Sequence, residues 1–157
     1  MTLPQTLERA GIAALIPHQG AMCLLSRLAC WDATRIVCIA SNHRDLAHPL
    51  RTRRGLLAPV TIEYAAQAMA LHGALLGMAA GTPATPGYLA SARSVQLAVL
   101  RLDDLPPPVQ AADELRITAI RQAGDARQIL YAFEVEHGGR SIATGRAAVV
   151  LNTPLAA

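Results

Sequence analysis

The pattern of hydrophobic and polar positions is dominated by one long apolar segment, Val60 to Ala80. Three polar side chains, Glu63, Gln67 and His72, interrupt it, and such groups are costly in a helix that faces lipid. We therefore predict a helix of about twenty residues that is buried within protein. Pro59 lies directly before it and favours a helix start there, because the first helical residue needs no N–H partner.

Three predicted elements and a loop precede this helix. Leu7 to Ile16 has an amphipathic pattern and predicts a short helix, which Pro17 ends. The apolar run Ala21 to Cys30 and the β-branched run Arg35 to Ala40 predict two strands. The polar stretch from Ser41 to Gly55 predicts the loop that leads into the long helix.

Four further strands are predicted after the helix, each marked by alternating apolar positions. They lie around Val95 to Val99, Leu115 to Ala119, Ile129 to Val135 and Ile142 to Leu151. Turn signals at Gly124-Asp125 and at His137-Gly138-Gly139-Arg140 separate the last three strands. The three consecutive prolines 106 to 108 predict an extended crossing that does not pair within a sheet.

The order of these elements predicts an α+β fold, because strands that are segregated from one long helix favour an antiparallel sheet. A helix that is apolar on all sides must also be covered on most of them. A single curved sheet wrapped around the helix covers it in this way, which is the arrangement of the hot-dog fold. The 157 residues allow one such domain, 1–157, and leave little room for a second.

Composition excludes several classes of protein. Hydrophobic residues make up 52% of the chain and charged residues 16%, which excludes a disordered chain. The 14 basic residues are all arginine and the net charge is +3, but only 3% of residues are aromatic and able to stack on bases. We therefore expect no nucleic-acid partner. The N-terminus has no apolar signal-type run, so we expect a cytoplasmic protein with no membrane partner.

Several reactive side chains are expected to have structural roles. Cys23, Cys30 and Cys38 lack the CxxC spacing of metal sites, so we expect buried thiols and no bound metal. His72 faces the side of the long helix opposite Glu63 and is expected to pack in the core. His137 falls in the predicted hairpin turn and is expected to be solvated.

Candidate chemistry centres on Glu63, in the first turn of the long helix. The same face of this helix holds small side chains and one amide, which suit the wall of a narrow channel: Ala66, Gln67, Ala70 and Ala74. Alternatively, Glu63 only complements the positive end of the helix dipole, which contributes about 0.3–1 kcal/mol. Three histidines, at 18, 43 and 48, precede it, and a His paired with a carboxylate commonly moves protons near neutral pH.

Two motifs stand out, Pro17-His18-Gln19-Gly20-Ala21-Met22-Cys23-Leu24-Leu25 and Glu63-Tyr64-Ala65-Ala66-Gln67-Ala68. The first resembles the opening loop and first strand of the β-hydroxyacyl-ACP dehydratases of fatty-acid synthesis. The second is similar to their central-helix motif. The chain resembles still more closely the smaller dehydratase-like hot-dog proteins of aryl polyene clusters, whose Gly-Tyr-Leu-Ala motif is matched by Gly87-Tyr88-Leu89-Ala90. The resemblance extends over most of the chain.

This resemblance implies dehydration of a 3-hydroxyacyl thioester carried on acyl carrier protein. A His takes the C2 proton, and Glu63 helps to protonate the departing 3-hydroxyl group. Gln67 orients the carboxyl group. The backbone N–H groups of Val60 or Thr61, at the helix start, stabilise the enolate-like oxygen.

Two histidines are candidates for the base. His48 lies fifteen residues before Glu63, close to the family spacing, but the Gly and Phe that flank this His in the dehydratases are missing. The Pro-Gly entry to the helix is also altered, to Leu57-Ala58-Pro59. His18 stands in the better-preserved motif, so we favour His18 slightly and retain both.

Arg51, Arg53 and Arg54, in the loop before the helix, are either solvated or form a docking patch. The partner would be an acidic acyl carrier protein, whose phosphopantetheine arm carries a phosphate that arginine binds by forked hydrogen bonds. Because the substrate arrives on that arm, no further cofactor is expected. An isolated hot-dog protomer exposes a sheet edge, so we expect a homo-oligomer, at least a dimer, or a heterodimer with another hot-dog subunit.

Two other functions stay open. A hot-dog thioesterase would use Glu63 to activate a water molecule and hydrolyse the acyl thioester. A non-catalytic subunit would lend binding surface to a second hot-dog protein, an option raised by the altered surroundings of His48 and Pro59.

Overall fold

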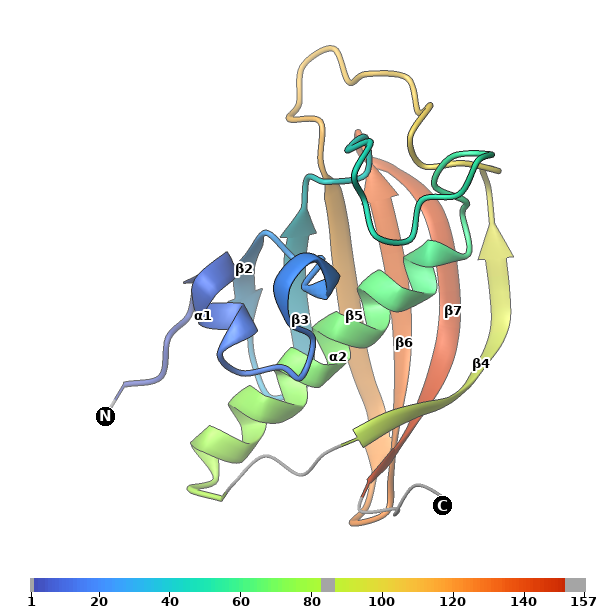
Figure 1. The fold of residues 1–157 in the computed structure, drawn as a ribbon. Coiled ribbons are helices and arrows are strands. Elements are labelled where there is room, and N and C mark those ends of the chain that lie inside the picture. Colours follow the sequence, from blue (N-terminus) through green and yellow to red (C-terminus); the bar gives the residue numbers. More distant parts are fainter. Residues whose placement is uncertain (1, 83–86, 152–157) are drawn as a thin grey trace.

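A curved antiparallel sheet wraps around one long helix, α2, in the computed structural model, which describes residues 2–82 and 87–151 (Figure 1). The seven strands have the order β1-β2-β3-β5-β6-β7-β4. The elements are β1 Leu7–Glu8, α1 Arg9–Ala13, the 3-10 helix η1 Gly20–Met22, β2 Arg27–Trp31, β3 Arg35–Ala40, α2 Val60–Ala79, β4 Gly87–Leu97, β5 Leu115–Gly124, β6 Gln128–His137 and β7 Arg140–Leu151. The hot-dog architecture predicted from the sequence is confirmed.

Helix α2 has the start and length that the sequence predicts. Small side chains such as Ala65 and Ala68 are fully buried on it, which lets the sheet approach the helix closely. The alternating residues of β6 supply the opposite layer of the core: Ile129, Tyr131, Phe133 and Val135. Among the described residues, no helix is long and apolar enough to cross a membrane.

The predicted strand Ala21 to Cys30 is largely wrong, because β2 begins only at Arg27. Of the backbone before it, Ser26 N donates to Ile39 O of β3 at 2.8 Å, but the residues further back bond to a side chain of α2. Leu24 N donates to Gln67 Oε1 at 2.8 Å, and Gln67 Nε2 donates to Met22 O at 2.7 Å. A buried chain segment needs partners for its polar groups, and here one glutamine provides them.

Other predicted boundaries are also corrected. The first helix is shorter than the predicted Leu7 to Ile16, because residues 7–8 pair with β2 as the edge strand β1. Strand β4 begins earlier than predicted, at Gly87, and ends before Val99. Cys30 is exposed and not buried, since the register between β2 and β3 shifts between Leu28 and Cys30.

The prediction of a solvated His137 is wrong. His137, the last residue of β6, is 6% exposed, and its Nε2 lies 2.8 Å from Asp113 Oδ1, to which it donates. His43 Nε2 donates to the same oxygen at 3.1 Å, and Arg44 pairs with this carboxylate as well. The hairpin itself is confirmed, but the loop before β5 covers its end. Asp113 thereby ties the loop after β3 to the end of β6.

Candidate active site

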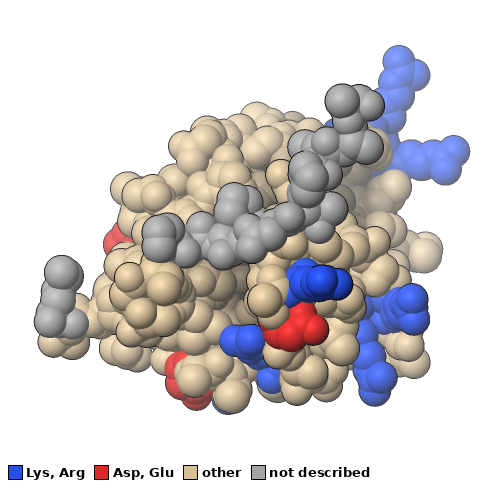
Figure 2. All heavy atoms as spheres, turned by 90° about the horizontal axis from the view of Figure 1, so that it is seen from below, with Lys and Arg blue, Asp and Glu red and all other residues tan. Residues whose placement is uncertain are grey.

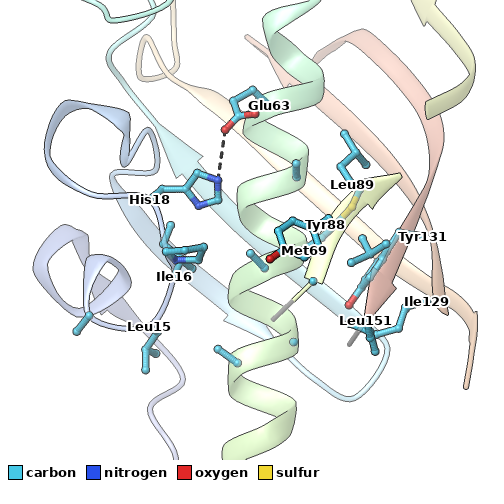
Figure 3. Close-up of a pocket in the computed structure, with 18 residues that line it drawn as sticks. Leu15, Ile16, His18, Glu63, Met69, Tyr88, Leu89, Ile129, Tyr131 and Leu151 are labelled. Carbon is cyan, nitrogen blue, oxygen red and sulfur yellow. Dashed lines mark ion pairs between the residues drawn. The ribbon is translucent and has the colours of Figure 1, made fainter. Parts of the chain in front are cut away.

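A cavity of about 740 Å³ runs along α2, between this helix, the chain before η1 and strands β4, β6 and β7. His18 and Glu63 lie at one part of its wall (Figure 3). The helix contributes mainly small side chains to the rest: Ala66, Met69, Ala70, Gly73 and Ala74. Of the channel face predicted from helical periodicity, Glu63, Ala66, Ala70 and Ala74 line the cavity, whereas Gln67 is fully buried and does not.

His18 and Glu63 form the polar centre of the cavity. His18 Nε2 lies 3.4 Å from Glu63 Oε1, and the two side chains are 26% and 33% exposed. Figure 3 shows the imidazole pointing from the chain before η1 toward the carboxylate on α2. The pair is thus reachable from the cavity, and an imidazole beside a carboxylate is a combination that serves in acid–base catalysis.

Gln67 holds this centre in place from one helical turn below Glu63. Its Nε2 donates to Glu63 Oε1 at 3.0 Å and also to Met22 O, and its Oε1 accepts from Leu24 N. Gln67 is completely buried, so water does not compete for these bonds. The amide therefore fixes the carboxylate and the loop next to His18 to the same turn of α2.

The His18 loop has further anchors. Gln19 Nε2 donates to Ala13 O at 2.8 Å, and Arg9 donates to Gly20 O at 2.8 Å. His18 Nδ1 is buried without a hydrogen-bond partner among the described residues, so Nε2 is the ring nitrogen that faces the reacting groups.

His48, the second candidate base, lies elsewhere. Its Nε2 donates to Tyr64 Oη at 3.0 Å, and its Nδ1 accepts from Leu50 N at 3.1 Å. Tyr64 Oη donates in turn to Asn42 Oδ1. Both ring nitrogens are engaged within the fold, and burial lowers the pKa of His48. Of the two candidates, the structure brings only His18 to Glu63.

The proposed oxyanion donors at the helix start are also engaged. Val60 N donates to Leu57 O and Thr61 N donates to Ala58 O, each at 3.0 Å. Neither residue is among those that line the cavity, whereas Glu63 is.

The three arginines of the preceding loop differ in their surroundings. Arg51 donates to Asp103 Oδ2 at 2.9 Å, and Arg101 donates to the same oxygen at 2.8 Å. The hydrogen bond from Arg101 is the largest cause that holds the pKa of Asp103 well below its usual range, and the backbone N–H of Leu56 adds to it. Gly55, with φ +101°, allows this close approach, since a Cβ there would lie 2.6 Å from Asp103 Oδ1. Arg53 and Arg54 are exposed.

The part of the cavity away from His18 and Glu63 was not predicted from the sequence. Tyr131 and Tyr88 line it, and Tyr131 Oη donates to His72 Nδ1 at 2.8 Å. The prediction of a core His72 is confirmed, since this side chain is fully buried. Alternation in β6 indicates that Tyr131 faces inward, but no local pattern indicates that a cavity lies there.

One group of described residues lies close enough together to hold a metal ion. The ligand atoms of His43, Asp113 and His137 are all within 4.8 Å of one another. Arg44 already balances the carboxylate charge, and both imidazoles donate to it. These contacts explain why the three side chains lie together: they connect the loop after β3, the loop before β5 and the end of β6. The expectation that no metal is bound stays a prediction.

Comparison with known proteins gives a family match over nearly the whole chain. Residues 10–156 match the family described as ApeP-like, ApeP dehydratase. No curated protein matches the sequence significantly.

Several solved structures share the fold. The dehydratase heterocomplex ApeI:P from Xenorhabdus doucetiae is 20% identical, with a TM-score of 0.76 over 90% of this chain and 91% of that chain. A hypothetical thioesterase with coenzyme A from Streptococcus pneumoniae TIGR4 is 10% identical, with a TM-score of 0.55 over 82% and 87%. The PaaI protein of the E. coli phenylacetic acid degradation operon is 13% identical, with a TM-score of 0.53 over 78% and 80%.

Proposed function

The chain belongs to the ApeP-like dehydratase family, and from this membership we propose that it removes water from a 3-hydroxyacyl thioester carried on acyl carrier protein. The product is the trans-2-enoyl thioester. The observation that carries the proposal is the His18–Glu63 pair, 3.4 Å apart on the wall of an apolar cavity.

In the proposed reaction, neutral His18 takes the C2 proton on Nε2 and protonated Glu63 gives its proton to the 3-hydroxyl group. The C3–O bond breaks, water leaves, and the C2–H electron pair becomes the C2=C3 double bond. His18 is then protonated and Glu63 ionised. Return of the proton from His18 to the Glu63 carboxylate restores both groups for the next turnover.

Gln67 supports the acid role of Glu63. The contacts to Gln67 and His18 both fall on Oε1, which leaves Oε2 as the oxygen that carries a proton to the substrate hydroxyl. The side-chain amide of Gln67 thus keeps the Glu63 carboxyl group in one orientation. A positioned general acid contributes about 10²–10⁴-fold to the reaction rate.

We propose that Arg53 and Arg54 meet the acyl carrier protein and that Arg51 does not. Arg51 is held by Asp103 within the chain, whereas Arg53 and Arg54 are exposed in the loop that leads into α2. Exposed arginines attract an acidic partner at long range and bind phosphate at short range.

A second hot-dog subunit is the proposed assembly partner. The structurally similar ApeI:P is a dehydratase heterocomplex. Strand β4 forms one edge of the sheet, and most of its residues are exposed. Since His18 and Glu63 both belong to this chain, we propose a subunit with its own acid–base pair and not a surface-lending partner.

Thioester hydrolysis is the second candidate, because the similar pneumococcal structure is described as a thioesterase. Glu63 would then activate water. Incubation with 3-hydroxyacyl carrier protein, followed by mass spectrometry, separates the two reactions: dehydration removes one water from the acyl chain, and hydrolysis releases free carrier thiol.

The assay is run with the chain alone and with a co-expressed hot-dog partner. Glu63→Gln should abolish the enoyl product in both. Enoyl product at the wild-type rate from this variant would contradict the acid role of Glu63. Thiol release without enoyl product from the wild type would contradict dehydration and support the thioesterase.

A further inference from the structure

A glycine, Gly73, lies in the interior of α2, where the backbone conformation does not require one. The positive φ angles that favour glycine occur at other glycines of the described chain, and Gly73 is not among them. Glycine in a helix interior is less favourable than alanine, because it loses more backbone freedom on folding. The helix therefore gives no reason for a glycine at this position.

Packing gives no reason either. On β7, a Cβ atom at Gly145 would lie 2.7 Å from the ring of Phe133, so the close contact there needs a glycine. A Cβ atom at Gly73 would have no heavy atom of the described residues within 4 Å, apart from its chain neighbours and the backbone of its own helix. The space beside Gly73 is thus not filled by described side chains.

This space belongs to the cavity that holds His18 and Glu63. Gly73 lines the cavity together with Ala66 and Ala70. These three residues are spaced by four and by three positions, so they share one face of the helix. A side chain at position 73 would therefore extend into the cavity, and the glycine keeps that part of it open.

Gly73 lies far from the reacting groups. It follows Glu63 by ten residues on α2, which corresponds to about 15 Å along the helix axis. Apolar side chains of β6 and β7, such as Ile129 and Leu151, line the remote part of the cavity, and Figure 3 shows these two well separated from Glu63. A thioester that reacts at Glu63 would thus bring only the far end of a long acyl chain to Gly73.

We propose that Gly73 is a specificity-determining residue, which admits long acyl chains because it leaves the cavity open beyond Ala70. This inference rests on the proposed function, which places the reacting end of the thioester at the His18–Glu63 pair. The substrate class that follows is a long-chain acyl thioester, since a short chain would leave the remote apolar wall uncovered. Each methylene group that the cavity buries should raise affinity by up to about fourfold.

The test measures binding of saturated acyl pantetheine thioesters of increasing length by calorimetry. They have no 3-hydroxyl group, so dehydration does not interfere, and the chain is used alone and with its co-expressed hot-dog partner. The dissociation constant of the wild type should fall with each added methylene until the chain has passed Gly73. A dissociation constant that does not depend on chain length would overturn the proposal without any variant.

Two variants narrow the cavity by different amounts. Short chains should bind Gly73→Ala and Gly73→Met as they bind the wild type, because they end before this position. Affinity should stop rising at a shorter chain length in both, and at the shorter of the two in Gly73→Met. The longest chain that the wild type accepts should bind Gly73→Met at least about tenfold more weakly, since an added side chain overpacks the occupied cavity. An unchanged length limit in folded Gly73→Met would contradict the proposal.

Ala79→Met is the matched control. Ala79 is exposed in the last turn of the same helix and is not among the residues that line the cavity. This variant should keep the wild-type length limit, and a shortened limit here as well would contradict a local effect at Gly73.

Thermal unfolding adds a test that does not depend on binding. Gly73→Ala should have a Tm no lower than that of the wild type, because alanine is the better helix former and its methyl group meets no described atom. A lower Tm would show that protein atoms fill the space beside Gly73, and would overturn the proposal.

The outcome is independent of the dehydration assay. Dehydration with the same length limit in the wild type and in Gly73→Met would remove the role of Gly73 and leave the proposed function. A limit that shortens in Gly73→Met, in a protein that does not dehydrate, would retain the role of Gly73 in acyl binding and remove the proposed function.

Discussion

His18 Nε2 lies 3.4 Å from Glu63 Oε1, and both residues belong to one chain. The imidazole comes from the chain before η1 and the carboxylate from the first turn of α2. Gln67 links the two elements, because it bonds to Glu63 and to the backbone of Met22 and Leu24. The position of the pair is therefore set by contacts within the subunit.

Exchange of each histidine for glutamine separates the two candidate bases. His18→Gln should lower kcat by about 10²–10⁴-fold with little change in Tm, since its ring contacts the cavity and not the core. His48→Gln should retain most of kcat but lower Tm, because it breaks the buried bond to Tyr64. Steady-state kinetics and thermal unfolding of both variants check this. A larger kcat loss in His48→Gln would assign the base to His48.

Gln67→Leu should weaken both stability and catalysis. The substitution leaves Leu24 N and Met22 O without their partner, at a cost of about 1–3 kcal/mol for each group that water does not reach. It also frees the Glu63 carboxylate, so kcat should fall while KM changes little. Urea unfolding and steady-state kinetics measure the two effects. Unchanged kcat in a folded Gln67→Leu protein would contradict the positioning role.

The free energy of unfolding should decrease as the pH falls below about 6.5. Burial lowers the pKa values of His43, His48 and His72 from the ordinary value of 6.5. The unfolded chain thus binds protons in a range where the folded chain does not, and stability is lost toward acid. The lowered pKa values of Asp103 and Asp113 affect the free energy of unfolding only near or below pH 3.8, the ordinary pKa of an aspartate.

Urea unfolding at about pH 7.5 and about pH 5 measures this slope. His43→Gln should flatten the slope, because it removes one of the buried imidazoles. Equal stability of the wild type at the two pH values would refute the assignment of neutral buried histidines.

Asp103→Asn should destabilise the loop before α2, whereas Asp104→Asn should have little effect. The Asp103 side chain is 4% exposed and pairs with Arg51 and Arg101, while the Asp104 side chain is 58% exposed. Loss of a buried partner leaves cations uncompensated and costs about 3–5 kcal/mol, reduced here because Arg101 is itself partly exposed. Thermal unfolding of the two variants gives the comparison, and equal Tm values would contradict it.

Charge reversal of Arg53 and Arg54 to Glu should raise KM for a substrate on acyl carrier protein but not for the matching pantetheine thioester. Both side chains are exposed, so the folded structure should persist. Arg127→Glu, in the turn between β5 and β6, is the control. Figure 2 views the molecule from that lower end, where the surface is mostly uncharged and basic side chains gather toward one side. The same KM change with the control variant would exclude a local docking patch.

Much of the fold follows from local pattern. The start of α2 after Pro59 and the alternation in β5, β6 and β7 reflect side-chain periods of 3.6 and 2, which each segment carries by itself. The hot-dog architecture then follows, because an apolar helix requires a sheet that covers it. The family match also confirms the resemblance carried by the Pro17-His18 and Glu63 motifs.

Tertiary structure decided which groups meet. The sequence favoured His18 only slightly over His48 as the base, and only folding brings His18 to Glu63 and His48 to Tyr64. Strand periodicity likewise did not predict that the Met22 and Leu24 backbone would bond to Gln67. Such contacts join segments far apart in sequence, so no local pattern encodes them.

The arginines also show what the sequence determined and what folding decided. Composition determined that every cation is an arginine, but the three arginines before α2 are indistinguishable in sequence. Folding pairs Arg51 with the buried Asp103 and leaves Arg53 and Arg54 exposed. The sequence by itself determined the sheet, the helix and the carboxylate in its first turn. The tertiary structure decided the partner of each charged or polar group, because that choice depends on distances between elements.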